Sequence, residues 1–132
     1  LHLSLRRQRQ MCIRDRVKDD LFDILGNEKT TGKKIGADVK RNMITLPLIY
    51  AYKKISKAEY RQVKKILSQK KKTRSNLNDL KEIIDRVGGF NYAMQKISEF
   101  NNQAIDALSP YPDSPYKKSM VDLISFNAQR KG

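Results

Sequence analysis

Apolar residues recur every three or four positions through nearly all of residues 17–132, and this periodicity restricts the chain to an all-α fold. No segment shows the strict alternation of a half-buried strand, and no apolar run approaches the length of a membrane-spanning helix. Glycines, prolines and polar clusters divide the pattern. It predicts helices at about 17–25, 38–54, 56–68, 76–87 and 90–108, and a last one from residue 115 onward.

Local signals refine several helix ends. Ser56-Lys57-Ala58-Glu59 forms a capping box, and Ser114-Pro115 is typical of a helix start. Pro47 is expected to kink the 38–54 helix or to end its first segment, and Asp38 is its predicted N-cap. Asn76 or Asn78 is the predicted N-cap of the helix at about 76–87. The inward residues expected of the last helix are Tyr116, Met120, Leu123 and Ile124.

Residues 1–16 differ from the rest of the chain because they lack helical or strand periodicity. Residues 6–15 resemble the translation of a transposase-type sequencing adapter. We therefore predict that 1–16 is a non-native segment and that 17–132 is part of one domain. Removing its five Arg and one Asp lowers the formal net charge from +14 to +10 and takes away the only His and Cys. A genuine basic tail that touches phosphate or membrane lipid is the alternative.

The acidic motif Asp19-Asp20-Leu21-Phe22-Asp23 is the most informative in the chain. Residues three and four apart are neighbours on a helix, so these three carboxylates are expected to converge. A divalent cation relieves their repulsion, and Mg²⁺ prefers carboxylate oxygens, waters and phosphates. The competing interpretation is acidic decoration of a helix's first turn, which the helix dipole favours.

A glycine-hinged basic loop follows at Gly32-Lys33-Lys34-Ile35-Gly36. Folded back on the acidic helix, it could offer Lys33 and Lys34 to the anion that the metal holds, which suggests a diphosphate site. Ordinary solvated charge is the alternative for these two lysines.

Together, the segments at residues 17–26, 32–38 and 45–49 resemble the trans-isoprenyl diphosphate synthase (polyprenyl synthetase) family of bacterial long-chain type. Their order and spacing match the family's second aspartate-rich motif, its Gly-Lys loop and its Thr-Leu-Pro helix. The resemblance implies an all-α helical bundle, of which this chain is the C-terminal third. It also implies an Mg²⁺-dependent, cytoplasmic, homodimeric enzyme that condenses isopentenyl diphosphate with an allylic diphosphate.

The resemblance also assigns roles to residues. Asp19 and Asp23 correspond to metal ligands that Asp20 supports, and Lys33 corresponds to the lysine that contacts the allylic diphosphate. The residues with possible supporting roles are Lys18, Lys34, Asp38, Lys40 and Thr45.

The sequence also departs from the family pattern. Asp15-Arg16 stand where the family usually has Phe-Gln, and Asn42-Met43 stand where it often has Gly-Lys. The loss of that lysine contact leaves Lys40 or Arg41 to replace it. The first aspartate-rich motif is absent from the sequence, so this chain by itself is not expected to catalyse elongation.

Basic clusters at Lys64-Lys65, at Lys70-Lys71-Lys72 and at Arg74 support a second hypothesis, a small helical nucleic-acid-binding module. No zinc pattern or RNA-binding signature accompanies them, so specific nucleic-acid recognition is not expected. The same lysines would suit peripheral contact with a membrane surface.

Overall fold

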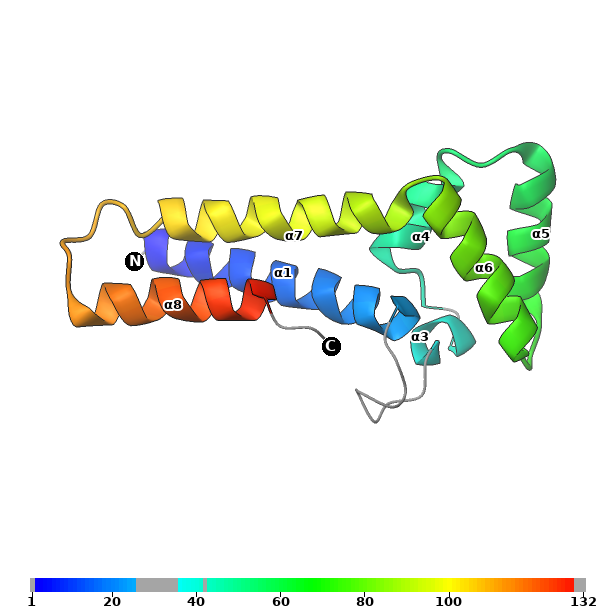
Figure 1. The fold of residues 1–132 in the computed structure, drawn as a ribbon, viewed down its shortest axis with the longest axis horizontal. Coiled ribbons are helices and arrows are strands. Elements are labelled where there is room, and N and C mark those ends of the chain that lie inside the picture. The colour runs from blue at the N-terminus through cyan, green and yellow to red at the C-terminus, as the bar shows by residue number, and fades with distance from the viewer. Residues whose placement is uncertain (1, 26–35, 42, 130–132) are drawn as a thin grey trace. The chain divides into compact units, whose positions relative to one another are not determined.

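The computed structural model describes residues 2–25, 36–41 and 43–129, and every regular element within these ranges is an α-helix (Figure 1). The prediction of an all-α fold is therefore confirmed. The helices are α1 (His2–Leu25), α3 (Ala37–Lys40), α4 (Leu46–Tyr52), α5 (Lys57–Ser68), α6 (Arg74–Arg86), α7 (Gly89–Asp106) and α8 (Pro115–Gln129).

The chain divides into two compact units, one of residues 19–93 and the other of residues 1–18 with 94–131. In the unit of residues 19–93, α6 contacts both α4 and α5. Its core is apolar because each of these helices turns one stripe inward. The buried residues of the three helices are Pro47, Leu48, Ala51, Val63, Ile66, Leu80, Ile83 and Ile84.

The start of α5 confirms the predicted capping box. The backbone N–H of Glu59 donates to Ser56 Oγ at 3.3 Å, and the backbone N–H of Ser56 donates to Glu59 Oε2 at 2.9 Å. The predicted cap of α6 was wrong, because the N-cap is Thr73, whose Oγ1 accepts from the N–H of Asn76 at 3.2 Å. Thr73 supplies the same acceptor three residues before Asn76, so α6 begins earlier than predicted.

The predicted helix at 38–54 is two separate helices. Helix α3 ends at Lys40, and α4 begins at Leu46 with Pro47 in its first turn. Proline has no N–H to donate, and it fits the first turn, where that donor would have no intrahelical partner. Asp38 lies in the first turn of α3 and is not its N-cap.

Gly89 lies where neighbouring backbone and side chains leave no room for a Cβ atom. A Cβ on Gly89, at the start of α7, would lie 2.8 Å from the carbonyl oxygen of Pro47 and 2.7 Å from a methyl carbon of Ile84. Nearby, the rings of Tyr50 and Tyr92 stack with centroids 4.3 Å apart. These contacts join the start of α7 to α4 and α6 without a side chain at position 89.

Tyr52 at the end of α4 contacts α5 through its ring. Its ring and that of Tyr60 meet edge to face, with centroids 5.3 Å apart. Burial, and secondarily the neighbouring phenol of Tyr60, raises the pKa of Tyr52. Tyr60 itself is 46% exposed.

In the other unit, α8 runs back along α7 (Figure 1). Ala104, Leu108 and Ile124 form its buried cluster, against which Met11 and Val121 pack. The predicted helix start at residues 114–115 is confirmed, since α8 begins at Pro115 and Ser114 Oγ accepts from the N–H of Lys117.

The predicted inward face of α8 was mostly wrong. Ile124 is buried, but Tyr116 is 83% and Leu123 is 50% exposed, and Met120 is exposed as well. The helix has more apolar residues than one stripe can hold, and the stripe that contains Ile124 is the one its neighbours cover.

Helix α1 begins at His2, although the sequence predicted a helix only from Val17. Arg, Gln and Leu recur through residues 1–16 and have high helix propensity, and neither Gly nor Pro occurs before residue 26. Arg14 is fully buried, and its Nη1 donates to Asn101 Oδ1 at 3.0 Å. A native and a non-native segment can pack equally well against the rest of a chain. The non-native origin of residues 1–16 therefore stays a prediction.

Within the described ranges, no helix combines the length and the apolar character needed to cross a bilayer.

Candidate metal and diphosphate site

The acidic motif lies in the last two turns of α1. Asp19 is exposed, whereas Asp20 and Asp23 are half-buried. Leu21 and Ile24 are buried and turn the other side of the helix toward the core. Burial of Leu21 and Ile24 therefore fixes the rotation of this end of α1, and with it the side on which the carboxylates lie.

Asp23 is the point at which the chain returns to α1. Its carbonyl oxygen accepts the backbone N–H of Gly36 at 2.8 Å, and its carboxylate Oδ2 accepts the backbone N–H of Asp38 at 3.0 Å. Gly36 has a φ of +71°, a left-handed conformation that glycine adopts without a steric penalty. The sequence suggested that the basic loop folds back on the acidic helix, but it did not indicate that the N–H groups of Gly36 and Asp38 bond to Asp23.

The expected convergence of three carboxylates is not found. In the described part of the chain, no group of three His, Cys, Asp or Glu side chains is placed to hold one metal ion. Asp23 follows Asp20 by three residues and Asp19 by four, so each of the two can neighbour it on the helix surface. Which of these carboxylates act as metal ligands stays a prediction.

Thr45 is the one buried side chain with an unpaired polar atom among the described residues. It is 1% exposed, and its Oγ1 has no hydrogen-bond partner. It is the N-cap residue of α4, yet its hydroxyl makes no capping bond. An unpaired buried hydroxyl costs about 1–3 kcal/mol, so a ligand or a water that bonds to this oxygen would be stabilising.

The predicted basic contributors are only partly described. Lys33 and Lys34 lie outside the described residues, as does the side chain of Lys40. Lys18 is 8% exposed, and Arg41 is exposed. The diphosphate contacts predicted for these cations therefore stay predictions.

Met43 occupies the place of the expected lysine. Its backbone N–H donates to the carbonyl of Asp38 at 2.8 Å, and that carbonyl also accepts the N–H of Arg41. Asp38 thus organises the turn after α3 through its backbone while its own N–H holds Asp23. Asp38 is half-buried and holds the segment in place by backbone hydrogen bonds.

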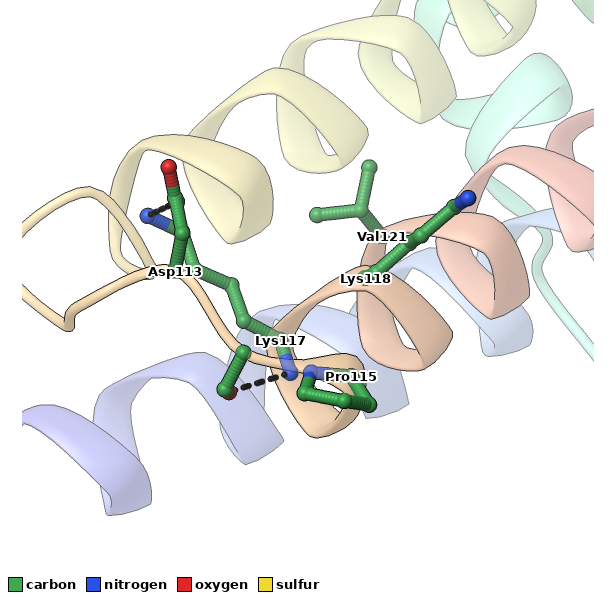
Figure 2. A pocket seen from close by; sticks show the side chains of 6 residues that line it. Asp113, Pro115, Lys117, Lys118 and Val121 are labelled. Atoms are coloured by element: carbon green, nitrogen blue, oxygen red, sulfur yellow. Dashed lines mark hydrogen bonds and ion pairs between the residues drawn. The ribbon is translucent and has the colours of Figure 1, made fainter.

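A separate pocket of about 530 Å³ lies at the start of α8 (Figure 2). The Nζ of Lys117 donates to Asp113 Oδ1 at 2.9 Å and to the carbonyl of Tyr111 at 2.8 Å. Besides Asp113 and Lys117, the pocket is lined by Ser114, Pro115, Lys118 and Val121. The ammonium of Lys117 is already engaged and no residue of the acidic motif lines this pocket, so it is not part of the candidate site.

A family profile described as "Polyprenyl synthetase" matches residues 9–85, which include the acidic motif, Asp38 and Thr45. The chain belongs to the polyprenyl synthetase family. Among curated relatives, the octaprenyl diphosphate synthase of Haemophilus influenzae is 27% identical over 112 residues. That match covers 85% of this chain and 34% of the relative.

Solved structures of this family share the fold. The geranylgeranyl pyrophosphate synthetase of Pyrococcus horikoshii superposes with a TM-score of 0.86 at 22% identity, over 95% of this chain and 38% of that one. The polyprenyl synthase of Caulobacter crescentus, crystallised with calcium and isoprenyl diphosphate, gives 0.79 at 22% identity, over 90% and 36%. This member of the polyprenyl synthetase family thus spans about a third of the length of the relatives it matches.

Proposed function

We propose that this chain is part of a trans-polyprenyl diphosphate synthase, and that the end of α1 binds Mg²⁺ together with the diphosphate of an allylic substrate. The whole enzyme would condense isopentenyl diphosphate with that substrate to give a longer trans-polyprenyl diphosphate. The observation that carries the proposal is the half-buried Asp23, four residues after Asp19 on the same helix, whose carboxylate accepts the backbone N–H of Asp38. Family membership and the divalent cation and isoprenyl diphosphate bound by the Caulobacter relative support it.

The donor set fits magnesium. Mg²⁺ is commonly held by one or two carboxylates plus substrate phosphates and waters, and it does not require a cage made wholly of protein. An ionised carboxylate has about four acceptor positions, so the bond from Asp38 is compatible with metal ligation by Asp23. When bound, Mg²⁺ neutralises charge on the diphosphate and so makes it a better leaving group.

The residues of this chain would divide the work. Asp19 and Asp23 bind the metal, and the N–H of Asp38 fixes the carboxylate of Asp23 before the ligand arrives. Thr45 offers a buried hydroxyl whose unpaired oxygen a ligand or its water shell could satisfy. Lys33 supplies positive charge to the diphosphate, with Lys34 beside it.

The predicted activity of the chain alone is binding without turnover. The sequence contains one DDxxD motif, whereas the family mechanism uses two that face each other. For the whole enzyme we propose a homodimer in the cytoplasm, which the family resemblance supports.

Isothermal titration of the 132-residue chain with inorganic pyrophosphate, with and without Mg²⁺, tests the proposal. We expect weak binding that requires both components. Asp19→Asn with Asp23→Asn should abolish it, since the amide cannot replace a charged metal ligand.

Asp85→Asn with Asp106→Asn is the matched control. It removes two exposed aspartates and so changes the net charge equally. Equal loss of binding in both double variants, or binding that does not require Mg²⁺, would contradict the proposed site.

A further inference from the structure

The solvent-facing side of α5 is a continuous row of positive charge. Val63 and Ile66 on the opposite side are buried, in keeping with the contact between α5 and α6. Four exposed basic side chains form this cationic face: Lys57, Arg61, Lys64 and Lys65. Successive members are four, three and one residues apart, a spacing that keeps them on one side of the helix.

Few acids accompany this charge along the chain. Residues 53–74 contain ten Lys or Arg and a single acidic residue, Glu59. Glu59 is already engaged, because it accepts from the backbone N–H of Ser56 and pairs with Arg86 of α6. Among the described residues, no ion pair involves a member of the cationic face.

The positive surface continues beyond the helix. Lys70 and Lys71 are exposed directly after α5, and Nζ of Lys72 donates to the carbonyl of Gln69 at 3.1 Å. One aromatic residue flanks the face: Tyr60 is 46% exposed and is held by its edge-to-face contact with Tyr52. Tyrosine is enriched where proteins meet the membrane–water interface.

We propose that the cationic face of α5 binds the surface of a bilayer that contains anionic phospholipids. The apolar side of α5 is buried in the protein, so the attraction is electrostatic and the helix lies on the headgroups without inserting. Eight of the ten basic residues in 53–74 are lysines, which act as point charges toward a diffuse negative surface. Arginine, with its bidentate fork, is the residue suited to fixed nucleic-acid phosphates, and here it is the minority.

Sedimentation with vesicles tests this inference on the full chain. We expect binding to vesicles of phosphatidylcholine mixed with phosphatidylglycerol, and little binding to phosphatidylcholine alone. Raising the salt well above about 0.1 M should weaken binding, because the screening length there is already only about 10 Å. Equal binding to both vesicle types would overturn the proposal.

Two double variants with the same net charge separate the face from charge in general. Arg61→Gln with Lys64→Gln removes two members of the face, and Lys81→Gln with Lys118→Gln removes two exposed lysines from α6 and α8. A basic residue near a membrane contributes about fivefold to binding, so the first variant should bind about 25-fold more weakly. The second should bind within about twofold of the parent.

Glutamine is a good helix former, so circular dichroism should show unchanged helix content. If the first variant loses helix, Lys57→Gln with Lys65→Gln repeats the test on the same face. Equal weakening by the α5 and the α6/α8 variants would overturn the proposal. The proposal would also be overturned if the chain bound duplex DNA more tightly than anionic vesicles at the same salt, and if Arg61→Gln with Lys64→Gln removed that DNA binding.

Discussion

The carboxylate Oδ2 of Asp23 accepts the backbone N–H of Asp38, fifteen positions later in the chain, at 3.0 Å. The N–H of Gly36 bonds to the carbonyl of the same aspartate. Asp23 is therefore both a proposed metal ligand and the anchor of the returning chain. A substitution at Asp23 should disturb both roles, whereas one at Asp19 should disturb only the first.

Asp23→Ala is expected to lower the free energy of unfolding by about 1–2 kcal/mol, because it removes a charged acceptor from the Asp38 N–H. Asp23→Asn retains an acceptor and should cost less. Both should lose Mg²⁺-dependent pyrophosphate binding. Urea unfolding and titration calorimetry measure the two effects. Asp19→Ala, at an exposed position, should lose binding with a stability change within about 0.5 kcal/mol. Undiminished binding by Asp23→Asn would refute the metal-ligand role.

Gly36→Ala should destabilise the unit of residues 19–93 by about 1–2 kcal/mol. The backbone is left-handed at φ +71°, which costs a residue with a Cβ about 1 kcal/mol or more. The added Cβ would also lie 2.9 Å from both δ carbons of Leu77. Gly36→Asn, which tolerates this conformation better, should lose less. Thermal unfolding followed by circular dichroism compares them, and equal losses would leave only the contact with Leu77 as the cause.

Local signals made part of this fold predictable. The capping box at Ser56 and the start of α8 depend on residues within one turn, so the sequence contains everything that decides them. The bond from Asp38 to Asp23 depends on how a loop closes, which no periodicity reports.

The exposed face of α8 was unpredictable for a related reason. Val121 and Ile124 lie on one apolar stripe, and Tyr116 and Leu123 lie on the next. Either stripe satisfies helical spacing, and the choice between them depends on the neighbouring helices. The acidic motif was found from sequence, but whether its three carboxylates converge depends on the geometry at the end of α1, where no such group of three is found among the described residues.

Thr45→Val tests whether the unpaired hydroxyl belongs to the fold or to a ligand. Valine has nearly the same shape, and removing a buried, unpaired polar group should leave stability unchanged or raise it by up to about 1 kcal/mol. Because the Thr45 hydroxyl makes no capping bond, α4 loses no cap. Chemical denaturation measures this, and a loss above about 1 kcal/mol would show that the hydroxyl has a partner. Weaker Mg²⁺–pyrophosphate binding at unchanged stability would assign the hydroxyl to the ligand.

The exposed stripe of α8 should make this chain self-associate. Its members are Tyr116, Met120, Leu123 and Phe126. An apolar patch of this kind on one helix favours association, because burial contributes about 25 cal/mol per Å² removed from water. Sedimentation velocity should therefore show a mass that rises with protein concentration, and Leu123→Gln with Phe126→Gln should restore the monomer.

Ile49→Gln with Tyr60→Gln provides the control for this last experiment, since both residues are exposed apolar side chains of the unit of residues 19–93. These substitutions remove exposed apolar surface from the other unit and should leave association unchanged. Equal loss of association in both variants would indicate diffuse hydrophobic attraction. If the unsubstituted chain stays monomeric at high concentration, the exposed stripe of α8 does not drive self-association and the prediction is wrong.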